Sequence, residues 1–290
     1  MNSNAQQELA LKRHDCRAPE SLPELAKRRL LAVPREPLSI VQWWRVLFLN
    51  SAVDPAALRR ELPPEFELEL HDDRAIVSLV ALTKRNFRPH PQSPLWGRLF
   101  SLLPEQRFLN VRTYARLRDV PGAFFLWSWL SRPFGLPLPD RPLGLTCAFA
   151  KSEYRHENES NGLQGAVTAK GKHFSYVVPM PLAAPLSVCP AGSLSEFALE
   201  RSTGYYGYRG AGRVFRAWHP AWLQTTVTVR INEDELIAER FPWFGEARFL
   251  EANYAPGFDE VWIGRPHSLE EERSRTRRNR HGPSALFEMG

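Results

Sequence analysis

The sequence predicts a single, mainly β (α+β) domain in which antiparallel strands form a closed or sandwich-like sheet with a few short helices around it. The 290 residues include 25 Pro and 17 Gly. Residues of these two types interrupt long helices and divide a chain into many short elements. Runs rich in aromatic and β-branched residues recur, several of them alternate apolar with polar residues, and turn motifs separate them. This combination is typical of antiparallel hairpins.

Two short helices are predicted near the N-terminus. Ser21 and Glu24 have the spacing of a capping box, so a helix is expected from Ser21 to Leu31. Asp54 followed by Pro55 places a capping carboxylate before a residue that favours the first helical position. We therefore expect a second helix to begin there.

The strands are predicted from apolar runs, and the turns from glycine. Asn161-Gly162 and Gly171 are expected to form hairpin turns. A third helix is expected from Leu194 to Arg201, with Ser193 as its cap. The predicted strands are Trp43–Ser51, Ala75–Leu82, Arg107–Leu117, Gly122–Leu130, Leu143–Tyr154, Leu163–Thr168, His173–Val178, Gly212–Trp218, Gln224–Val229 and Val261–Gly264.

One domain accounts for most of the chain, because no repeat or Gly/Ser-rich linker divides it. Residues 1–36 are expected to be a mobile tail that contains the first short helix, and residues 37–269 to form the domain. Residues 270–290, which include the run EEERSRTRRNRHG, are expected to be a charged, disordered tail.

Charge and cysteine usage exclude several function classes. The net charge is +6, and residues 1–36 and 270–290 together supply half of it. A nucleic-acid-binding domain concentrates basic residues on one face, so this function is not expected. Cys16, Cys147 and Cys189 are isolated, which favours a reducing cytoplasm over a disulfide framework. The longest apolar run, Ala123–Leu130, is too short to span a membrane.

Familiar catalytic and cofactor motifs do not occur. The eight His residues lack HExxH or paired-Cys spacing, so no metal or other cofactor is expected. GxSxG is absent, which excludes a nucleophile elbow. The stretch Gly204–Gly212 is glycine-rich, but it favours a strand pair with a turn over a phosphate loop. Lys170 and Lys172 flank Gly171 and are expected to be solvated turn residues.

Arg112 is the polar residue of most interest. In the predicted strand Arg107–Leu117, Asn110, Arg112 and Tyr114 share one face, and apolar residues with Thr113 share the other. If the polar face lines the interior of a barrel, the guanidinium could bind a carboxylate through two hydrogen bonds. The alternative is a polar face that meets water, because alternation does not show which face is inside.

The chain from about Trp43 to Pro266 resembles domain-of-unknown-function family two thousand and seventy-one, in the acetoacetate decarboxylase-like superfamily. Order and spacing of several segments together carry the resemblance. In chain order they are WWRVLFLNSAVDPAALRRELPPEFEL from Trp43, RAIVSLVAL with Arg88-Pro89 after it, LNVRTYAR at Leu109–Arg116, FGLPL at Phe134–Leu138, LERSTGYYGYRGAGRVFRAWHPAWLQ at Leu199–Gln224, and YAPGFDEVWIGRP at Tyr254–Pro266.

The resemblance implies a cone-shaped antiparallel β barrel with an internal pocket. It also implies a lysine just after a Gly-x-Pro turn, which forms a Schiff base with a β-keto acid in such enzymes. Here the comparable turn, Phe134 to Pro139, is apolar throughout. Phe108 also stands where an acidic residue is expected. The resemblance therefore implies an interior that keeps a cation but has no amine to trap a ketone.

The main hypothesis is a small-molecule binding domain without the Schiff-base lysine, which holds an organic acid. Arg112 would bind the carboxylate, with Asn110 and Tyr114 nearby and Arg88 as a further basic residue. Expected partners are a small carboxylate, neither nucleic acid nor membrane, and a homo-oligomer stays open.

Two alternatives remain. The chain could be an enzyme acting on a keto acid or related substrate, either a lyase or hydrolase that uses His219 or Lys151, or a decarboxylase whose lysine lies elsewhere. His219, beside Pro220, belongs to the family pattern and could be a general acid or base, although a histidine that anchors a turn is the simpler interpretation. Lys151 lies in a predicted strand and could line a cavity. The last alternative is an interaction module with a Trp-rich surface.

Overall fold

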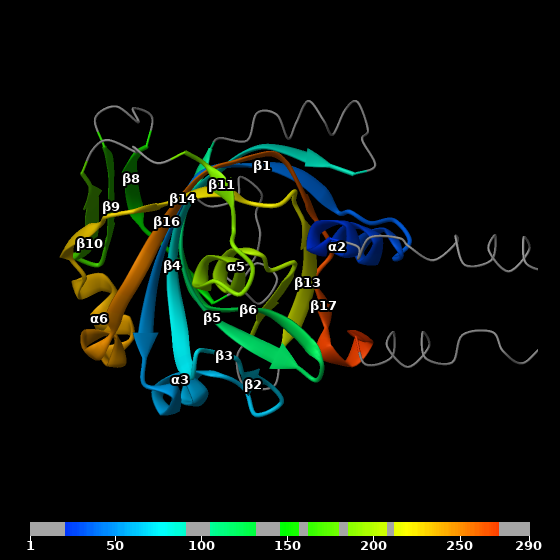
Figure 1. The fold of residues 1–290 in the computed structure, drawn as a ribbon, viewed down its shortest axis with the longest axis horizontal. Coiled ribbons are helices and arrows are strands. Elements are labelled where there is room, and N and C mark those ends of the chain that lie inside the picture. Colours follow the sequence, from blue (N-terminus) through cyan, green and yellow to red (C-terminus); the bar gives the residue numbers. More distant parts are fainter. Residues whose placement is uncertain are drawn as a thin grey trace, which may run out of the picture.

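A computed structural model describes residues 21–90, 105–131, 146–156, 162–179, 185–207 and 212–272. Strands predominate, and the helices are short (Figure 1). The helices are α2 (Leu22–Leu31), α3 (Pro55–Glu61), α5 (Leu194–Leu199), α6 (Glu235–Arg240) and the 3-10 helix η3 (Pro242–Glu246). The strands are β1 (Ser39–Val53), β2 (Glu67–Leu68), β3 (Leu70–His71), β4 (Arg74–Pro89), β5 (Gln106–Leu117), β6 (Val120–Leu130), β7 (Cys147–Phe149), β8 (Lys151–Arg155), β9 (Leu163–Ala169), β10 (Lys172–Val178), β11 (Ser187–Val188), β12 (Thr203–Tyr206), β13 (Arg213–Trp218), β14 (Leu223–Val227), β15 (Arg230–Glu233), β16 (Arg248–Ile263) and β17 (His267–Ser268).

The larger sheet follows the order β11-β14-β16-β1-β4-β5-β6-β12-β13-β17. Most neighbours are antiparallel, but β12 runs parallel to β6. β13 also pairs with β16, through Ala217 with Ile263 and Trp218 with Trp262. The pairings from β16 round to β13 therefore return to β16, and α5 lies inside the outline of these strands in Figure 1.

The smaller sheet has the order β15-β10-β9-β8. Lys170 and Gly171 both have positive φ, at 50° and 77°, in the tight turn between β9 and β10. Two consecutive positive φ values are the geometry of a two-residue hairpin turn, so the turn predicted at Gly171 is confirmed. At the other predicted hairpin turn, Asn161 lies outside the described residues.

The predicted helix starts are confirmed by their capping bonds. The hydroxyl of Ser21 accepts the backbone N–H of Glu24, although the distance is long at 3.4 Å. The hydroxyl of Ser193 accepts the N–H of Glu196 at 3.1 Å. Asp54 likewise accepts an N–H from the first turn of α3. Each capping side chain satisfies a helix N–H that has no partner within the helix.

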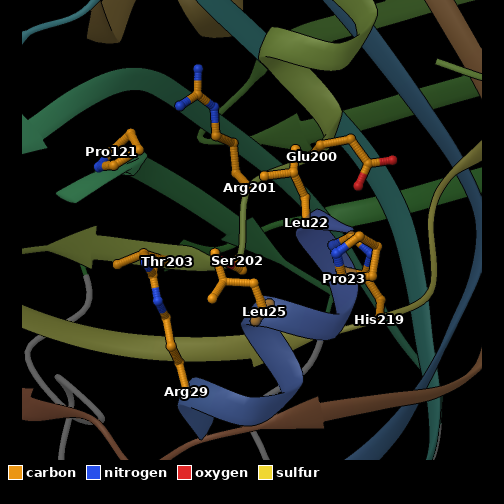
Figure 2. A pocket seen from close by; sticks show the side chains of 11 residues that line it. Leu22, Pro23, Leu25, Arg29, Pro121, Glu200, Arg201, Ser202, Thr203 and His219 are labelled. Atoms are coloured by element: carbon orange, nitrogen blue, oxygen red, sulfur yellow. The ribbon is translucent and has the colours of Figure 1, made fainter. Parts of the chain in front are cut away.

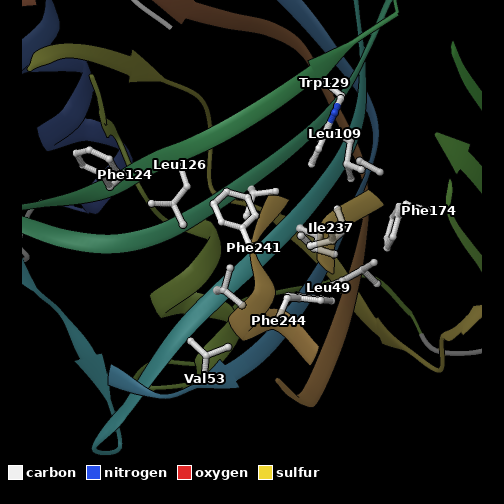
Figure 3. Close-up of a cluster of buried hydrophobic side chains, with 14 of the residues drawn as sticks. Leu49, Val53, Leu109, Phe124, Leu126, Trp129, Phe174, Ile237, Phe241 and Phe244 are labelled. Carbon is white, nitrogen blue, oxygen red and sulfur yellow. The ribbon is translucent and has the colours of Figure 1, made fainter. Parts of the chain in front are cut away.

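Both faces of the central strands β4 and β5 are buried, but against different neighbours. One face packs on the smaller sheet, α6 and η3 through what we call the outer cluster, which includes Leu49, Leu109, Phe174 and Phe241 (Figure 3). The opposite face packs in a second group of buried side chains that we call the inner cluster. The inner cluster contains Phe48, Val80, Leu82, Phe108, Tyr114 and Trp222.

Several strands are longer than the sequence predicts, most of all β4 and β16. β4 continues past Leu82 to Pro89, and β16 begins at Arg248 although Pro256-Gly257 reads as a turn. Gly257 has a φ of 97°, and a Cβ there would lie 2.1 Å from the carbonyl oxygen of Trp43. Glycine therefore lets β1 and β16 pass closely at an irregularity in their pairing, so the strand continues.

The helices α6 and η3 were not predicted, while the strand pair predicted across Gly204–Gly212 is present as β12 and β13. Of the tails expected at residues 1–36 and 270–290, residues 1–20 and 273–290 lie outside the described residues, and α2 packs on the domain through the buried Ala26 and Leu30. None of the helices in the described part of the chain is long and apolar enough to cross a membrane.

Candidate ligand-binding cavity

A cavity of about 180 Å³ lies on the inner face of the larger sheet. This volume is below the range of about 300–1,000 Å³ typical of pockets for drug-sized ligands. Side chains of β4, β5 and β6 form one wall, and β12, β13 and Trp222 contribute to the rest. The apolar part of the wall consists mainly of Val46, Phe48, Val80, Leu82, Phe108, Phe125, Phe215 and Trp222.

The pairing of β1, β4 and β5 arranges the inward side chains in rows. Trp43, Lys84 and Gln106 are paired directly across the three strands, and we call this the Lys84 row. Asn50, Ser78 and Arg112 are paired in the same way and form the Arg112 row. Between them lie a row with Leu82 and Phe108 and a row with Phe48, Val80 and Asn110.

Arg112 lines the cavity, so the face that it shares with Asn110 and Tyr114 is the inner one. Its Nη2 donates to the carbonyl oxygen of Ala198 in α5 at 2.6 Å. Its Nε is buried and has no partner among the described residues. The guanidinium lies 5.0 Å from the Phe48 ring centre and 5.7 Å from that of Tyr114. Ring faces attract the charge, but they leave its hydrogen-bonding capacity unused.

Lys84 also lines the cavity, which the sequence did not lead us to expect. Its Nζ lies 4.4 Å from the ring centre of Phe108 and 5.7 Å from that of Trp43. Lys84 is half-buried, and part of its side chain lines the cavity. Burial lowers its pKa from 10.5 to about 8. An apolar surrounding disfavours the charged form of an amine, so Lys84 is readily deprotonated.

Lys84 corrects the expectation that the interior has no amine. Its signal was present in the sequence, because Ser78, Val80, Leu82 and Lys84 keep a period of two along one strand. The predicted strand ends at Leu82, one step of this alternation before Lys84. The family's own lysine position is a separate matter, since residues 134–139 lie outside the described residues.

Other polar groups on the cavity wall are donors or are paired with one another. Asn110 accepts a hydrogen bond from Ser128 at 2.8 Å, which leaves its amide N–H groups as donors at the wall. Arg201 also lines the cavity, but it forms an ion pair with Glu69 at 3.0 Å. None of the described residues that line the cavity carries a carboxylate. The charges of Lys84 and Arg112 are therefore not balanced within the wall.

Tyr114 lies beside Arg112 and begins a chain of buried hydrogen bonds. Its hydroxyl is 2.6 Å from that of Ser78, which donates to Asn50. Asn50 donates to Asn253 at 2.9 Å, and Asn253 donates to Gln224 at 3.2 Å. The chain crosses β5, β4, β1, β16 and β14. Buried polar groups satisfied in this way hold neighbouring strands in a single register.

His219 lines a smaller pocket of about 90 Å³ under α2, shown in Figure 2. Leu22 and Leu25 of α2 lie across this pocket from the segment Glu200–Thr203. Burial, with a smaller contribution from the charge of Arg112, lowers the pKa of His219 to about 4. Its Nδ1 is 2.7 Å from the carbonyl oxygen of Pro220. This contact is the turn-anchoring arrangement, and the neutral ring donates from Nδ1.

The other two sequence candidates lie away from the cavity wall. Lys151 is exposed and pairs with Glu153 at 2.7 Å, because Lys151, Glu153 and Arg155 occupy the solvent side of β8. The interpretation of Lys151 as a cavity residue is therefore wrong. Arg88, near the end of β4, lies 3.6 Å from Glu260 in a partly exposed ion pair. In the described part of the chain, no group of three or more His, Cys, Asp or Glu is placed to hold a metal.

Solved structures share this fold at low sequence identity. The enduracididine biosynthesis enzyme MppR, complexed with pyruvate, has a TM-score of 0.57 and 14% identity over 82% of this chain and 93% of that one. An acetoacetate decarboxylase-like enzyme from Sphingomonas wittichii RW1 has a TM-score of 0.53 and 14% identity over 88% and 97%. At this identity the similarity shows a common fold, mostly β with few helices, and no more.

Sequence comparison identifies the family. No curated protein is significantly similar in sequence. The sequence profile of DUF2071, described as an uncharacterized conserved protein, matches residues 41–253. This match covers most of the chain and includes β1, β4, β5 and the greater part of the cavity wall. The chain therefore belongs to the DUF2071 family.

Proposed function

We propose that this chain binds a small organic acid in the cavity and that Arg112 holds the carboxylate. The observation that carries the proposal is a guanidinium on the wall of an apolar cavity with no carboxylate among the described wall residues. A buried cation without a counter-ion is costly, and an anionic ligand would offset that cost. The fold shared with MppR, whose solved structure is a complex with pyruvate, is consistent with a ligand of this class.

The proposed cavity is the interior of a cone-shaped barrel formed by the ring of pairings from β16 to β13. In such a barrel one face of every strand is enclosed, so inward polar groups act at low dielectric. Asn110 would donate to the ligand from the row next to Arg112. Tyr114 would help to position Arg112, since its hydroxyl and Nη2 of Arg112 both lie within hydrogen-bond distance of the Ala198 oxygen.

The test is calorimetric titration with short-chain carboxylates and with the matching amides, which have the same shape without the charge. Wild type is expected to bind acids and not amides. In Arg112→Met the dissociation constant for acids is expected to rise at least about tenfold, as for a lost hydrogen bond to a charged group. Arg107→Met is the control, because Arg107 lies on the same strand but donates to Ser152 at 3.1 Å outside the cavity.

Equal binding of acids and amides would contradict the proposal. So would an Arg112→Met variant that binds acids as well as wild type does, provided that its far-ultraviolet circular dichroism is unchanged.

A second candidate function, capture of a carbonyl compound, is favoured by Lys84. Its pKa of about 8 leaves about half of the amine neutral at pH 8, against well under 1% for an ordinary lysine. The neutral amine would attack the carbonyl carbon of an oxo acid, and loss of water would leave a C=N bond. In this second candidate function, carbonyl chemistry would occur on β4 and not at the Gly-x-Pro turn that the resemblance implies.

Borohydride reduction in the presence of pyruvate tests this second candidate. The hydride adds to the imine carbon and fixes the ligand to the lysine, so intact mass and peptide mapping locate it. The expected adduct is on Lys84, absent from Lys84→Met and retained in Lys170→Met, whose lysine is an exposed turn residue. Absence of an adduct from wild type would exclude imine formation with pyruvate and would leave the carboxylate proposal unaffected.

A further inference from the structure

The cavity has two polar ends separated by an apolar band. Lys84 and Arg112 are six positions apart in the register of β4 and β5, which is about 20 Å between their backbone rows. The two rows between them contribute Phe48, Leu82 and Phe108, all at most 6% exposed. A ligand that contacts both cations would therefore lie along these two rows.

Both charged groups lean toward this band. Nζ of Lys84 lies closer to the Phe108 ring, at 4.4 Å, than to the ring of Trp43 in its own row, at 5.7 Å. The guanidinium of Arg112 lies closer to Phe48, at 5.0 Å, than to Tyr114 on its far side, at 5.7 Å. Each cation is thus nearer to the ring on the side of the other cation, which shortens the distance that a ligand must span.

Each end of the cavity also has buried hydrogen-bond donors without partners among the described residues. At the Lys84 end this is the indole N–H of Trp43. The indole N–H of Trp222 also has no partner among the described residues, and its ring lies 6.0 Å from that of Trp43 and 5.3 Å from that of Phe48 in the band. At the Arg112 end they are Nε of Arg112 and the hydroxyl of Tyr206. Tyr206 is level with Arg112 because both pair with Phe125. A buried unpaired donor is destabilising, so each end is suited to an oxygen acceptor.

We propose that the ligand is two-headed, with a carboxylate at Arg112, a second oxygen-bearing group at Lys84, and an apolar carbon chain between them along Phe48, Leu82 and Phe108. This inference rests on the proposed function, since Arg112 is taken as the site of the carboxylate. It adds the substrate class: straight-chain dicarboxylic acids, or acids with a carbonyl at the far end. Both share the oxygen acceptor that Lys84 would bind.

The experiment measures affinity for a series of unbranched α,ω-dicarboxylates and for monocarboxylates of the same carbon number. For wild type, we expect one carbon-chain length at which the dicarboxylate binds at least about tenfold more tightly than the monocarboxylate of the same carbon number. In Lys84→Met and Lys84→Gln the second carboxylate is expected to strengthen binding less than about threefold. Lys170→Met is the control for loss of one positive charge far from the cavity.

The outcomes separate this inference from the proposed function. If monocarboxylates bind through Arg112 and the second carboxylate adds nothing at any length, the two-headed ligand is wrong and the carboxylate site stands. If neither series responds to Arg112→Met, the proposed function fails first. An ω-oxo acid that binds more tightly than the dicarboxylate of equal length identifies the second head as a carbonyl, and the reverse order identifies it as a carboxylate.

Discussion

Both faces of β4 and β5 are largely buried, but the inner face borders a cavity with two cations on its wall. On the outer face, Tyr154 donates to the carbonyl oxygen of Phe108 at 2.8 Å, and His156 lies between Tyr176 at 2.8 Å and the Arg45 oxygen at 3.1 Å. On the inner face, Arg112 and Lys84 meet a cavity with donors unused. The hydrogen bonds across the outer face stabilise it, whereas two cations on a cavity wall with no carboxylate among the described wall residues suit a ligand.

The largest expected effect on stability comes from removing a large buried side chain from the outer face. Phe241 is fully buried in the outer cluster (Figure 3), so Phe241→Ala leaves a void and should lower the free energy of unfolding by about 3–5 kcal/mol. Phe215 is partly exposed and already borders the cavity, so Phe215→Ala should cost about 1 kcal/mol. Urea unfolding of both variants measures the difference. Equal losses would show that the two faces do not differ in packing.

The next effect concerns the buried amine. Because the pKa of Lys84 is lowered to about 8 in the folded state, the unfolded chain binds a proton more readily between pH 8 and 10.5. The contribution of Lys84 to the free energy of unfolding should therefore rise with pH across this window, by up to about 3 kcal/mol and less where water in the cavity screens the charge.

Lys84→Met removes this dependence, so the variant should be more stable than wild type below pH 8 and lose that advantage above pH 10.5. Denaturant unfolding at pH 7.5 and at pH 10 measures it, with Lys170→Met as a control that should follow wild type. Parallel profiles for wild type and Lys84→Met would mean that the amine is solvated.

Two glycines sharpen the comparison further. A Cβ on Gly165 would lie 2.2 Å from the Tyr176 ring, which is buried and has no space to move into. A Cβ on Gly204 would lie 2.3 Å from the Phe215 ring, which can shift into the cavity. Gly165→Ala should cost about 1–3 kcal/mol and Gly204→Ala clearly less. Thermal unfolding ranks them, and the opposite order would contradict the assignment of free space to the inner face.

The smallest expected effect is on the hydrogen-bond chain behind Arg112. Tyr114→Phe removes one hydroxyl and should cost about 1 kcal/mol of stability. It should also weaken carboxylate binding about threefold, since Arg112 loses a neighbour at the Ala198 oxygen. Tyr205→Phe is the matched control, because its hydroxyl donates to Val120 at 2.9 Å and its ring lies in the outer cluster. A change in affinity in both variants would assign the effect to stability alone.

Local features of the fold could be predicted from the sequence, and long-range ones could not. The caps of α2, α3 and α5 and the turn at Gly171 depend on neighbouring residues, so pattern sufficed. The path of β16 through Pro256-Gly257 depends on the close approach of Trp43, more than two hundred positions away. Nothing local distinguishes that glycine from one in a turn.

The candidate site could also be predicted only where its signal is local. Alternation placed Asn110, Arg112 and Tyr114 on one face, and the pairing with β4 and β6 makes that face the inner one. Lys84 was missed because Lys84-Arg85 reads as the polar end of a strand. The strand continues because β1 and β5 pair with it on both sides. The alternation of side chains along the paired strand, and not the hydrophobicity of the segment, therefore indicates that Lys84 faces inward.

The meeting of β1 with β16 has a consequence for how the molecule is made. Asn50 and Asn253, which are hydrogen-bonded across these strands, are 203 positions apart. During synthesis, one edge of β1 has no strand to pair with until β16, about two hundred residues later, has emerged from the ribosome. The cavity therefore forms only after β16 has joined β1, and a chain truncated before β16 keeps an open, aromatic-rich strand edge that is prone to aggregation.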